Sequence, residues 1–483
     1  MKANYNNKVQ GRLKGFLPFY LFTFLLFFVA VLLFFALAYP HHLHYQEQFQ
    51  LFLFDSTYVW DVVRHLGGFA DLLGRFCTQF FLYAWVGAAI IALLLSAIQL
   101  LTLRLLTSHL FYGLTFIPSF LLWLYLLNEN ALLSGVWAVL LSLLVACVIV
   151  KWANGWTRRI LLIVAIPVLY YLVGPVCLPI PIDSLWLGVH YYRYPTIFPW
   201  LLWAAALSIW VIFGLYLLIR RRQVHSPHLS PLTSYLSFAI VAIIMGSFVW
   251  KNVNIKAEKV MQYDFMARHQ QWNRILETAN AEKPNNQIGV TVQNLALAMH
   301  GVLLDQMFNY NQNGIAGLLP DVKEDATSPL PTAEAFYQLG MINVAQRTVF
   351  EAQEAILDFQ KSGRCYKRLA QTNLINGSYE VARKYLTALQ KTLFYRDWAD
   401  ETLPLLGDEA AIARHPEYGR LRRMAYDNDY YFSDHVTPEM LRDLYFQNTD
   451  NGLAYQYLVA YYMLTGDRDG YTQLLRHIQE VKN

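Results

Sequence analysis

The stretch FLPFYLFTFLLFFVAVLLFFALAY, residues 16–39, decides the architecture of this 483-residue chain. It contains no charged residue, and as an α-helix it would be about 36 Å long. Because the hydrocarbon core of a bilayer is about 30 Å thick, the stretch predicts a helix that crosses a membrane. A cleaved signal peptide is the alternative, since basic residues precede the stretch and Ala36-Leu37-Ala38 resembles a cleavage site. The length of the apolar run favours an anchor that is retained.

Six further apolar runs follow within the first 250 residues. Each is close to the length that a membrane-spanning helix requires. The predicted spans are residues 80–103, 106–127, 131–150, 160–176, 197–219 and 232–250. The run at 160–176 is the shortest and contains Pro167, which predicts a kink or an irregular segment. Residues 1–250 are therefore expected to form a transmembrane domain of about seven spans.

The charged residues of this half are sorted to opposite ends of the spans. Of its 14 Lys and Arg residues, 11 lie at one end. All six acidic residues lie at the other end: Glu47, Asp55, Asp61, Asp71, Glu129 and Asp183. By the positive-inside rule the basic end is cytoplasmic. Seven crossings then place residues 251–483 in the periplasm and the protein in a bacterial inner membrane, with the lipid bilayer as its first partner.

The composition excludes several classes of function. The net charge of +4 for the whole chain combines about +8 in the first half with about −4 in residues 251–483, and the positive charges lie in loops between spans. No basic surface interleaved with aromatic residues is evident, so no nucleic acid is expected as a partner. The spans contain almost no ionisable side chains, which argues against a transporter. No nucleotide or dinucleotide motif occurs, and no cofactor is expected.

Residues 251–483 are predicted to form a soluble, all-α domain of helical hairpins. One hairpin is indicated by a small residue between two helices and by alanine at a close packing position: Leu374, Gly377, Tyr379, Ala382, Leu386 and Leu389. Similar patterns occur around Gly340 (with Phe336 and Phe359) and Gly466, and a weaker one includes Met266 and Trp272. The pattern resembles tetratricopeptide (TPR) repeats. Stacked hairpins form a curved surface suited to binding a periplasmic protein or a glycan.

The outer loop at residues 40–79 is the first candidate site. Asp55, Asp61 and Glu47 are candidate general bases, and Arg64 and Arg75 are candidate phosphate ligands. The alternative is that these residues cap and pair along an interfacial helix. His41, His44 and Glu47 share one helical face at three-residue spacing, but no fourth ligand is specified, so no metal is predicted.

The outer loop at residues 175–199 is the second candidate site. Its prolines exclude a regular helix, and it contains Asp183, His190 and Arg193 among several aromatic residues. These side chains could cover the first loop and bind substrate. The alternative is an aromatic belt with one arginine that extends to the interface. Of the four cysteines, Cys77, Cys177 and Cys365 could form a disulfide outside the cytoplasm, but no disulfide framework is implied.

The chain resembles an uncharacterised multi-pass membrane protein family of the Bacteroidota. The resemblance lies in residues 41–45 through Gly67-Gly68, in Gln79-Phe80-Phe81, and in two later stretches, 374–377 and 393–396. It implies a location in the cell envelope and no particular activity.

In layout, the membrane half also resembles GT-C glycosyltransferases, which use lipid-phosphate-linked sugars. That resemblance implies that Asp55 or Asp61, or else Glu47, deprotonates an acceptor and that arginines hold a polyprenyl-phosphate-sugar donor. The class places its acid just after the first span, where this chain has His41, His42 and His44.

Two hypotheses follow. The first is a non-catalytic envelope protein whose repeat domain binds a protein or an envelope polymer. The second is a GT-C-type transferase, which requires Asp55 or Asp61 to face Arg193 or Arg64 across a cavity.

Overall fold

The computed structural model describes residues 2–64, 67–106, 112–152, 155, 160, 193, 197–221, 231–321, 328–356, 360–426 and 437–482. Its elements are helices, which confirms the all-α fold class. The chain divides into two compact units. Unit 1 consists of Met1–Glu47 and Asp55–Asn254, and unit 2 consists of Gln48–Phe54 and Ile255–Asn483.

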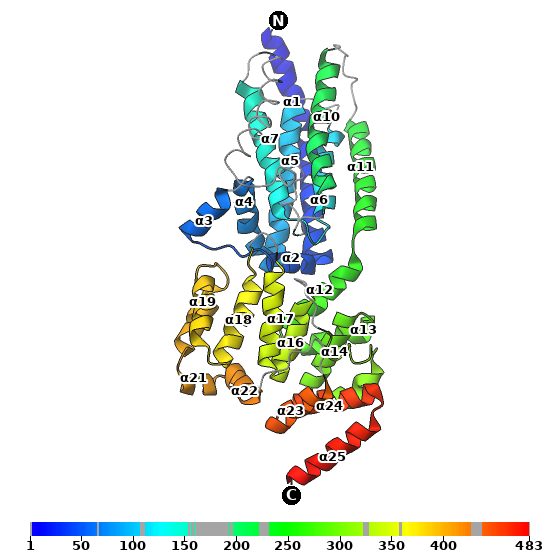
Figure 1. The fold of residues 1–483 in the computed structure, drawn as a ribbon. Coiled ribbons are helices and arrows are strands. Elements are labelled where there is room, and N and C mark those ends of the chain that lie inside the picture. The colour runs from blue at the N-terminus through cyan, green and yellow to red at the C-terminus, as the bar shows by residue number, and fades with distance from the viewer. Residues whose placement is uncertain are drawn as a thin grey trace. The chain divides into compact units, whose positions relative to one another are not determined.

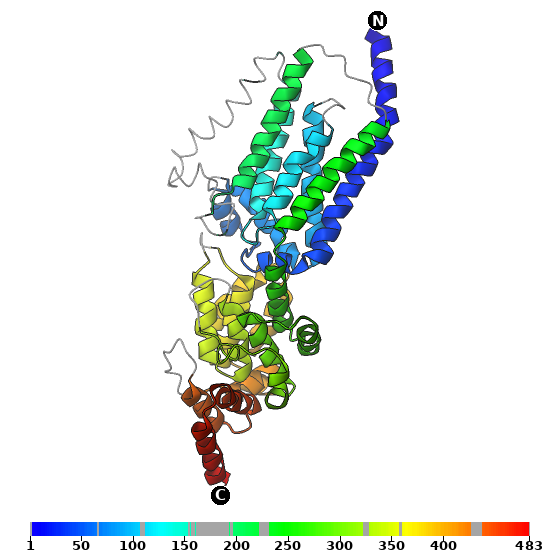
Figure 2. The same cartoon turned by 90° about the vertical axis from the view of Figure 1, so that its right-hand side faces the viewer.

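Unit 1 is built from long apolar helices joined by short ones. Figures 1 and 2 show α1, α5, α7, α10 and α11 packed lengthwise in one bundle. The helices are α1 (Lys2–Leu33), α2 (Pro40–Glu47), α3 (Ser56–Val63), α4 (Gly68–Thr78), α5 (Ala84–Leu106), α6 (Ile117–Tyr125), α7 (Leu133–Trp152), α10 (Trp200–Arg221) and α11 (Pro231–Asn252). A π-helical turn, η1 (Phe34–Ala38), extends α1, and two 3-10 turns, η2 (Gln79–Leu82) and η4 (Gly113–Phe116), precede α5 and α6.

Three helical segments in the described part of the chain are long and apolar enough to cross a membrane: Pro18–Ala38, Ala84–Leu105 and Leu133–Trp152. Each has 20 to 22 residues and would be about 30 Å long. The number rises to four if Phe238–Asn252 and Ile255–Arg268, which meet at a bend of 61°, are counted as one broken span. The expectation of seven spans is therefore corrected to three or four.

Helix length explains part of the difference. In place of the predicted span 106–127, the described helix is Gly113–Tyr125, which at 1.5 Å per residue is about 20 Å long, less than the hydrocarbon thickness. In place of 197–219, the apolar helix is Trp200–Tyr216, within α10, which continues to Arg221. Hydropathy alone could not show where the helices begin and end. The predicted span 160–176 lies, apart from Ile160, outside the described residues.

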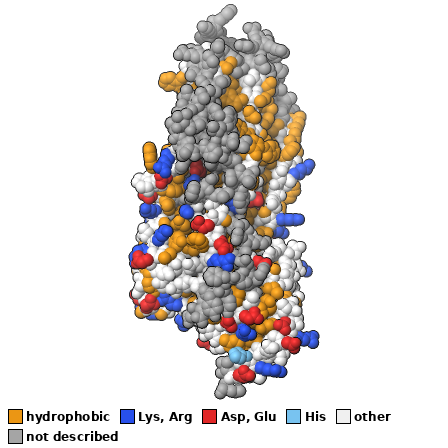
Figure 3. All heavy atoms as spheres, viewed as in Figure 1, with side chains coloured by type: hydrophobic (Ala, Val, Ile, Leu, Met, Phe, Trp, Pro, Cys, Tyr) orange, Lys and Arg blue, Asp and Glu red, His pale blue; other side chains and the backbone are white. Residues whose placement is uncertain are grey.

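The outer surface of unit 1 is apolar. Large side chains of the long helices, such as Leu21 and Leu93, are more than half exposed, and apolar atoms cover much of the coloured surface of this unit in Figure 3. Trp85 and Trp200 at the starts of α5 and α10, and Trp250 at the end of α11, are also more than half exposed. A soluble protein rarely exposes such a continuous surface, whereas lipid-facing helices require it, with tryptophan at the interfaces.

Unit 2 is an array of shorter amphipathic helices with charged side chains scattered over its surface (Figure 3). Its helices are α12 (Ile255–Arg268), α13 (Trp272–Glu282), α14 (Gln287–Met299), α15 (Leu303–Gln306), α16 (Pro329–Leu339), α17 (Ile342–Glu354), α18 (Gly363–Ile375), α19 (Tyr379–Gln390), α20 (Arg396–Thr402), α21 (Glu409–Arg414), α22 (Pro416–Met424), α23 (Pro438–Gln447), α24 (Gly452–Thr465) and α25 (Arg468–Lys482). Short 3-10 turns, η6 (Met307–Asn309) and η7 (Leu403–Leu405), follow α15 and α20.

Helical hairpins occur at the three glycines singled out in the sequence. Gly340, Gly377 and Gly466 have φ of 91°, 76° and 69°. They end α16, α18 and α24 before α17, α19 and α25 begin. Glycine adopts this left-handed conformation without the steric cost that a Cβ brings, so it ends a helix and reverses the chain. Phe359, expected in one of these hairpins, lies outside the described residues.

Seven residues of the predicted first outer loop belong to unit 2. In this inserted segment, Gln48–Phe54, the Leu51 amide donates to the Lys361 carbonyl at 2.8 Å and the Phe54 amide donates to the Lys391 carbonyl at 2.7 Å. The Leu51 side chain is buried in a small core with Ala370, Leu386, Leu389, Tyr395 and Ala399. Burial of a leucine side chain stabilises a fold by about 2 kcal/mol. The inserted segment is therefore part of the packing of α18 and α19.

Candidate functional site

The two aspartates proposed as bases make local contacts. Asp61 on α3 forms an ion pair at 3.1 Å with Arg64, which caps the end of this helix, and both side chains are more than half exposed. Asp55 precedes α3 and accepts a hydrogen bond from the Thr57 hydroxyl at 2.8 Å. A GT-C-type site requires a carboxylate that faces a cation across a cavity, whereas the cation that pairs with Asp61 lies on the same helix.

Asp71 and Arg75 form a second local pair on α4, at 2.6 Å and mostly buried. Burial alone would lower the pKa of Arg75, but Asp71 and Tyr58 raise it, so the guanidinium stays charged. The same helix packs closely on α7 at Gly74. A Cβ at this position would lie only 2.6 Å from the Ser134 amide nitrogen, so the contact leaves room for glycine alone. The pair thus stabilises the short helices at the acidic end of unit 1.

Arg193 contacts the first loop through a cation–π interaction with Tyr45. Its backbone amide donates to the Asn130 carbonyl at 2.7 Å, and its guanidinium lies 5.2 Å from the centre of the Tyr45 ring. Arg193 and Glu47 are both buried. Asp183 and His190, the other candidates of the 175–199 loop, lie outside the described residues.

The histidines after the first span have separate surroundings. The rings of His41 and His44 are 5.8 Å apart, and His44 Nδ1 lies 3.1 Å from the Phe81 carbonyl. His42 is fully buried against Tyr39, and burial lowers its pKa to about 3, so it is neutral at physiological pH. No group of three His, Cys, Asp or Glu side chains arranged for a metal occurs in the part of the chain that was described.

Unit 2 contains a larger cluster of charged side chains around α18. Ser362 caps this helix by accepting a hydrogen bond from the Cys365 amide, which fixes where the helix begins. Arg364, Lys367 and Arg368 then lie three and four residues apart, on one face. We call the following set the α18 cluster: Asp264, Arg268, Glu334, Arg364, Lys367, Arg368 and Glu417.

Arg364 joins three parts of unit 2. Its guanidinium donates to both carboxylate oxygens of Asp264 on α12, at 2.6 and 2.8 Å. It also donates to the side-chain oxygen of Gln48 in the inserted segment at 2.9 Å. Paired donors of this kind are the strong form of the arginine–carboxylate interaction, so Arg364 binds α12 and the inserted segment to α18.

Arg368 lies at the buried centre of the cluster. It forms an ion pair with Glu334 on α16, and its guanidinium lies 3.6 Å from the centre of the Tyr337 ring. The Tyr337 hydroxyl donates to Glu417 on α22 at 2.9 Å. The helices α16, α18 and α22 therefore meet around Arg368. Their polar groups, on Glu334, Tyr337, Arg368 and Glu417, form one connected set of contacts.

Lys367 differs from the two arginines. Among the residues that the structure describes, no carboxylate forms an ion pair with its ammonium group, which lies 4.8 Å from the centre of the Trp398 ring. Burial and the positive charges of Arg268 and Arg368 lower the pKa of Lys367 to about 8. The carboxylates of Glu417 and Glu334 act on the pKa of Lys367 in the opposite direction, but less strongly.

The sequence did not reveal this cluster because its members lie between residues 264 and 417 and meet only in the folded array. One signal was available. Arg364, Lys367 and Arg368 fall on one face of a helix whose neighbours are apolar, and a buried face with three cations requires partners.

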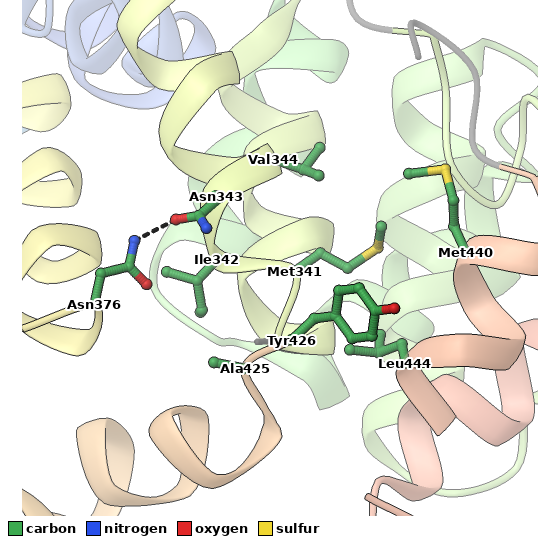
Figure 4. Close-up of a pocket in the computed structure, with 9 residues that line it drawn as sticks. All are labelled: Met341, Ile342, Asn343, Val344, Asn376, Ala425, Tyr426, Met440 and Leu444. Atoms are coloured by element: carbon green, nitrogen blue, oxygen red, sulfur yellow. Dashed lines mark hydrogen bonds between the residues drawn. The ribbon is translucent and has the colours of Figure 1, made fainter. Parts of the chain in front are cut away.

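Two hollows in the described part of unit 2 lie away from the α18 cluster. One, of about 20 Å³, holds no more than a water molecule and lies between α17 and α23 (Figure 4), lined by Met341, Ile342, Asn343, Val344, Asn376, Ala425, Tyr426, Met440 and Leu444. The other is an open hollow of about 320 Å³ along the α12–α13 turn.

The described cysteines are free thiols. Cys77, Cys147 and Cys365 form no disulfide, and Cys177 lies outside the described residues. Burial raises the pKa of Cys365 to about 11. A thiol in that state is a poor nucleophile at neutral pH.

Comparison with protein families places most of this chain in one group. Residues 16–483 match DUF6057, described as a family of unknown function. Comparisons with curated proteins and with solved structures gave no match. Because the matched region covers nearly all of the sequence, the chain belongs to DUF6057.

Proposed function

We propose that this protein is an integral inner-membrane protein of the cell envelope whose helical-repeat unit binds a partner in the periplasm. The observation that carries the proposal is the contrast between the surfaces of the two units. Unit 1 exposes large apolar side chains along helices that match the bilayer thickness, whereas unit 2 has its own buried core and a charged surface. An array of stacked hairpins is a binding architecture.

The distribution of charge supports the orientation. Arg104 and Lys151 lie in the last turns of α5 and α7. At the other ends of these helices lie α2, with Glu47, and the turn that contains Glu129. By the positive-inside rule the first of these ends is cytoplasmic and the second is periplasmic.

On this proposal unit 2 lies in the periplasm, as the resemblance to a Bacteroidota envelope family also suggests.

A pair of reporters fused after Asn483 tests the proposal. We expect alkaline phosphatase, which folds only outside the cytoplasm, to be active in that position, and we expect green fluorescent protein exported through the Sec route to be dark. The same reporters fused after Lys151 are the control and should give the opposite pattern. A fluorescent, phosphatase-inactive fusion after Asn483 would overturn the proposal.

A further inference from the structure

Helix α4 is amphipathic, but its apolar face is turned outward. This face carries four residues at three- and four-residue spacing, which are Phe69, Leu72, Leu73 and Phe76. Phe69 is 56% exposed and Phe76 is 37% exposed, and both leucines are partly exposed. In a soluble protein, a surface helix places such a stripe against the core and its charged residues in water. The arrangement in α4 is the reverse, so its exposed face does not fit a position in water.

The charged residues of α4 lie on a different face and are mostly buried. Asp71 and Arg75 form an ion pair whose side chains are only 24% and 13% exposed, and Arg75 also interacts with Tyr58 on α3. Removing such a pair from water costs desolvation energy, so a helix surrounded by water would expose the pair and bury the phenylalanines. Next to hydrocarbon the preference is the opposite, because charged side chains there turn to the protein interior and pair with one another.

The packing of α4 places it beside a helix that can span a membrane. Gly74 contacts Ser134 at the start of α7, and Figure 1 shows α4 between α3 and α7. The segment Leu133–Trp152, which is α7, is long and apolar enough to cross a membrane. In contrast, α4 has 11 residues and would be about 16 Å long, about half the hydrocarbon thickness. It is therefore long enough to enter one leaflet but too short to cross the bilayer.

The segments on both sides of α4 expose aromatic residues. Tyr83 and Trp85, at the start of α5, are each 53% exposed, and Trp60 on α3 is 68% exposed. Tryptophan and tyrosine are enriched at the boundary between hydrocarbon and water. In contrast to the pair on α4, the ion pair Asp61–Arg64 is more than half exposed. A helix that exposes both a tryptophan and an ion pair fits that boundary, so the polarity of the exposed surface falls from α3 to α4.

We propose that α3 and α4 form a membrane element that does not span the bilayer. The exposed face of α4, with Phe69 and Phe76, contacts lipid acyl chains in the leaflet at the acidic end of unit 1, and α3 lies among the headgroups. Lipid fits this face better than a protein partner does, because the chain continues from it into α5, a helix that is long and apolar enough to cross the membrane. The inference rests on the proposed function, which makes this leaflet the periplasmic one.

Spin labels on the full-length protein in nanodiscs test this proposal. Single labels are attached at Phe69→Cys and Phe76→Cys after the four native cysteines are replaced by alanine. Each label's collision rates are measured with oxygen, which concentrates in hydrocarbon, and with a nickel chelate, which stays in water. We expect the oxygen-to-nickel ratio at both positions to approach that of Leu93→Cys on α5, which is 59% exposed. It should exceed, several-fold, the ratio at Asp61→Cys and at Lys384→Cys in unit 2.

The opposite result would overturn the proposal. If the labels at positions 69 and 76 collide with nickel as often as the label at position 384 does, the face is in water. That result would also be obtained if the face were the docking site of another protein, since the nanodiscs contain only this chain and lipid.

A second variant makes the test independent of the cysteine replacements. Phe69→Asp in the otherwise unchanged protein places a carboxylate on the exposed face of α4. Facing lipid, this charge is costly, so we expect the temperature of unfolding in nanodiscs to fall. Phe350→Asp on α17 is the matched control, because that phenylalanine is 49% exposed in unit 2, where the same change should have little effect. No fall for Phe69→Asp, or an equal fall for both variants, would overturn the proposal. Both measurements report contact with lipid and not the side of the membrane, so their failure leaves the result of the reporter fusions after Asn483 unaffected.

Discussion

The two units use charged residues in different ways. In unit 1 the ion pairs Asp61–Arg64 and Asp71–Arg75 each lie within one helix, three or four residues apart. In unit 2, Arg364 pairs with Asp264 at a separation of 100 residues and Arg368 with Glu334 at 34. The partners in these two pairs of unit 1 are therefore neighbours along the chain, brought together by the local helix alone. These two pairs of unit 2 join helices that only the folded array brings together, although local pairs such as Arg347–Glu351 also occur in this unit.

This difference predicts how each pair responds to mutation. Exposed ion pairs within one helix contribute about 0–1 kcal/mol, because water screens them and holding both side chains costs entropy. A buried pair contributes little in itself, but loss of one partner leaves an uncompensated charge and costs about 3–5 kcal/mol. The comparison between the units can therefore be tested one pair at a time.

The largest effect is expected for Arg368→Ala. The substitution leaves Glu334 buried without its cation and removes the ring contact with Tyr337. We expect the free energy of unfolding of unit 2, measured by urea-dependent proteolysis of the full chain, to fall by about 3–5 kcal/mol. Arg64→Ala on α3 is the matched control and should change stability by less than about 1 kcal/mol. Equal losses in the two variants would remove the contrast between the units.

The next effect concerns the inserted segment. Leu51→Ala removes a buried side chain from the core around Leu386, which should cost about 2–4 kcal/mol. Hydrogen exchange should accelerate in α18 and α19, far along the sequence from the substitution. The control is Phe54→Ala, since that side chain is half exposed and its backbone bond to Lys391 persists. If exchange rises only near residue 51, the segment is not part of the unit 2 core.

The sequence predicted the local features of both units and missed the contacts between residues that are far apart along the chain. Apolar runs and the glycines at 340, 377 and 466 are local signals, and they correctly predicted an all-α chain with hairpins. The ends of helices are weaker signals, which is why seven runs predicted more full-length spans than the three or four found. The role of Gln48–Phe54 depends on carbonyl groups of Lys361 and Lys391, and the α18 cluster depends on four helices, α12, α16, α18 and α22. No local pattern contains that information.

The third prediction concerns pH. The pKa of Lys367 is lowered from 10.5 to about 8 in the folded protein, so between these values the unfolded chain binds more protons. Stability attributable to this group should therefore rise as the pH rises from about 8 to about 10.5, and it should be flat and at its lowest below pH 8. Lys367→Met should be more stable than the wild type near pH 7, and the difference should shrink towards pH 10.5. Lys384→Met, on the exposed face of α19, should show no such difference.

A smaller effect is expected at a turn where a residue other than glycine has a positive φ. Gln270, between α12 and α13, has φ of 54°, a conformation that strains a residue with a Cβ. Gln270→Gly should stabilise unit 2 by about 0.5–1 kcal/mol. The reverse change is Gly377→Ala at φ of 76°, where a Cβ would meet only the Arg422 guanidinium, at 4.0 Å; it should destabilise unit 2 by a similar amount. Urea unfolding of both variants measures the pair, and the same sign for both would contradict this account of the turns.

The smallest effect is expected for Asp61→Asn. Its ion pair with Arg64 is more than half exposed, so stability should change by less than about 0.5 kcal/mol, and the protein level in the membrane should be unchanged. Asp71→Asn is the comparison on the neighbouring helix, where the partner arginine is mostly buried and the loss should be larger. Since Asp61→Asn is expected to leave the fold intact, it also tests the transferase hypothesis against the binding function. A surface-glycan defect in this variant at normal protein level would show that the carboxylate acts in chemistry, and the transferase hypothesis would then replace the binding function proposed for this protein.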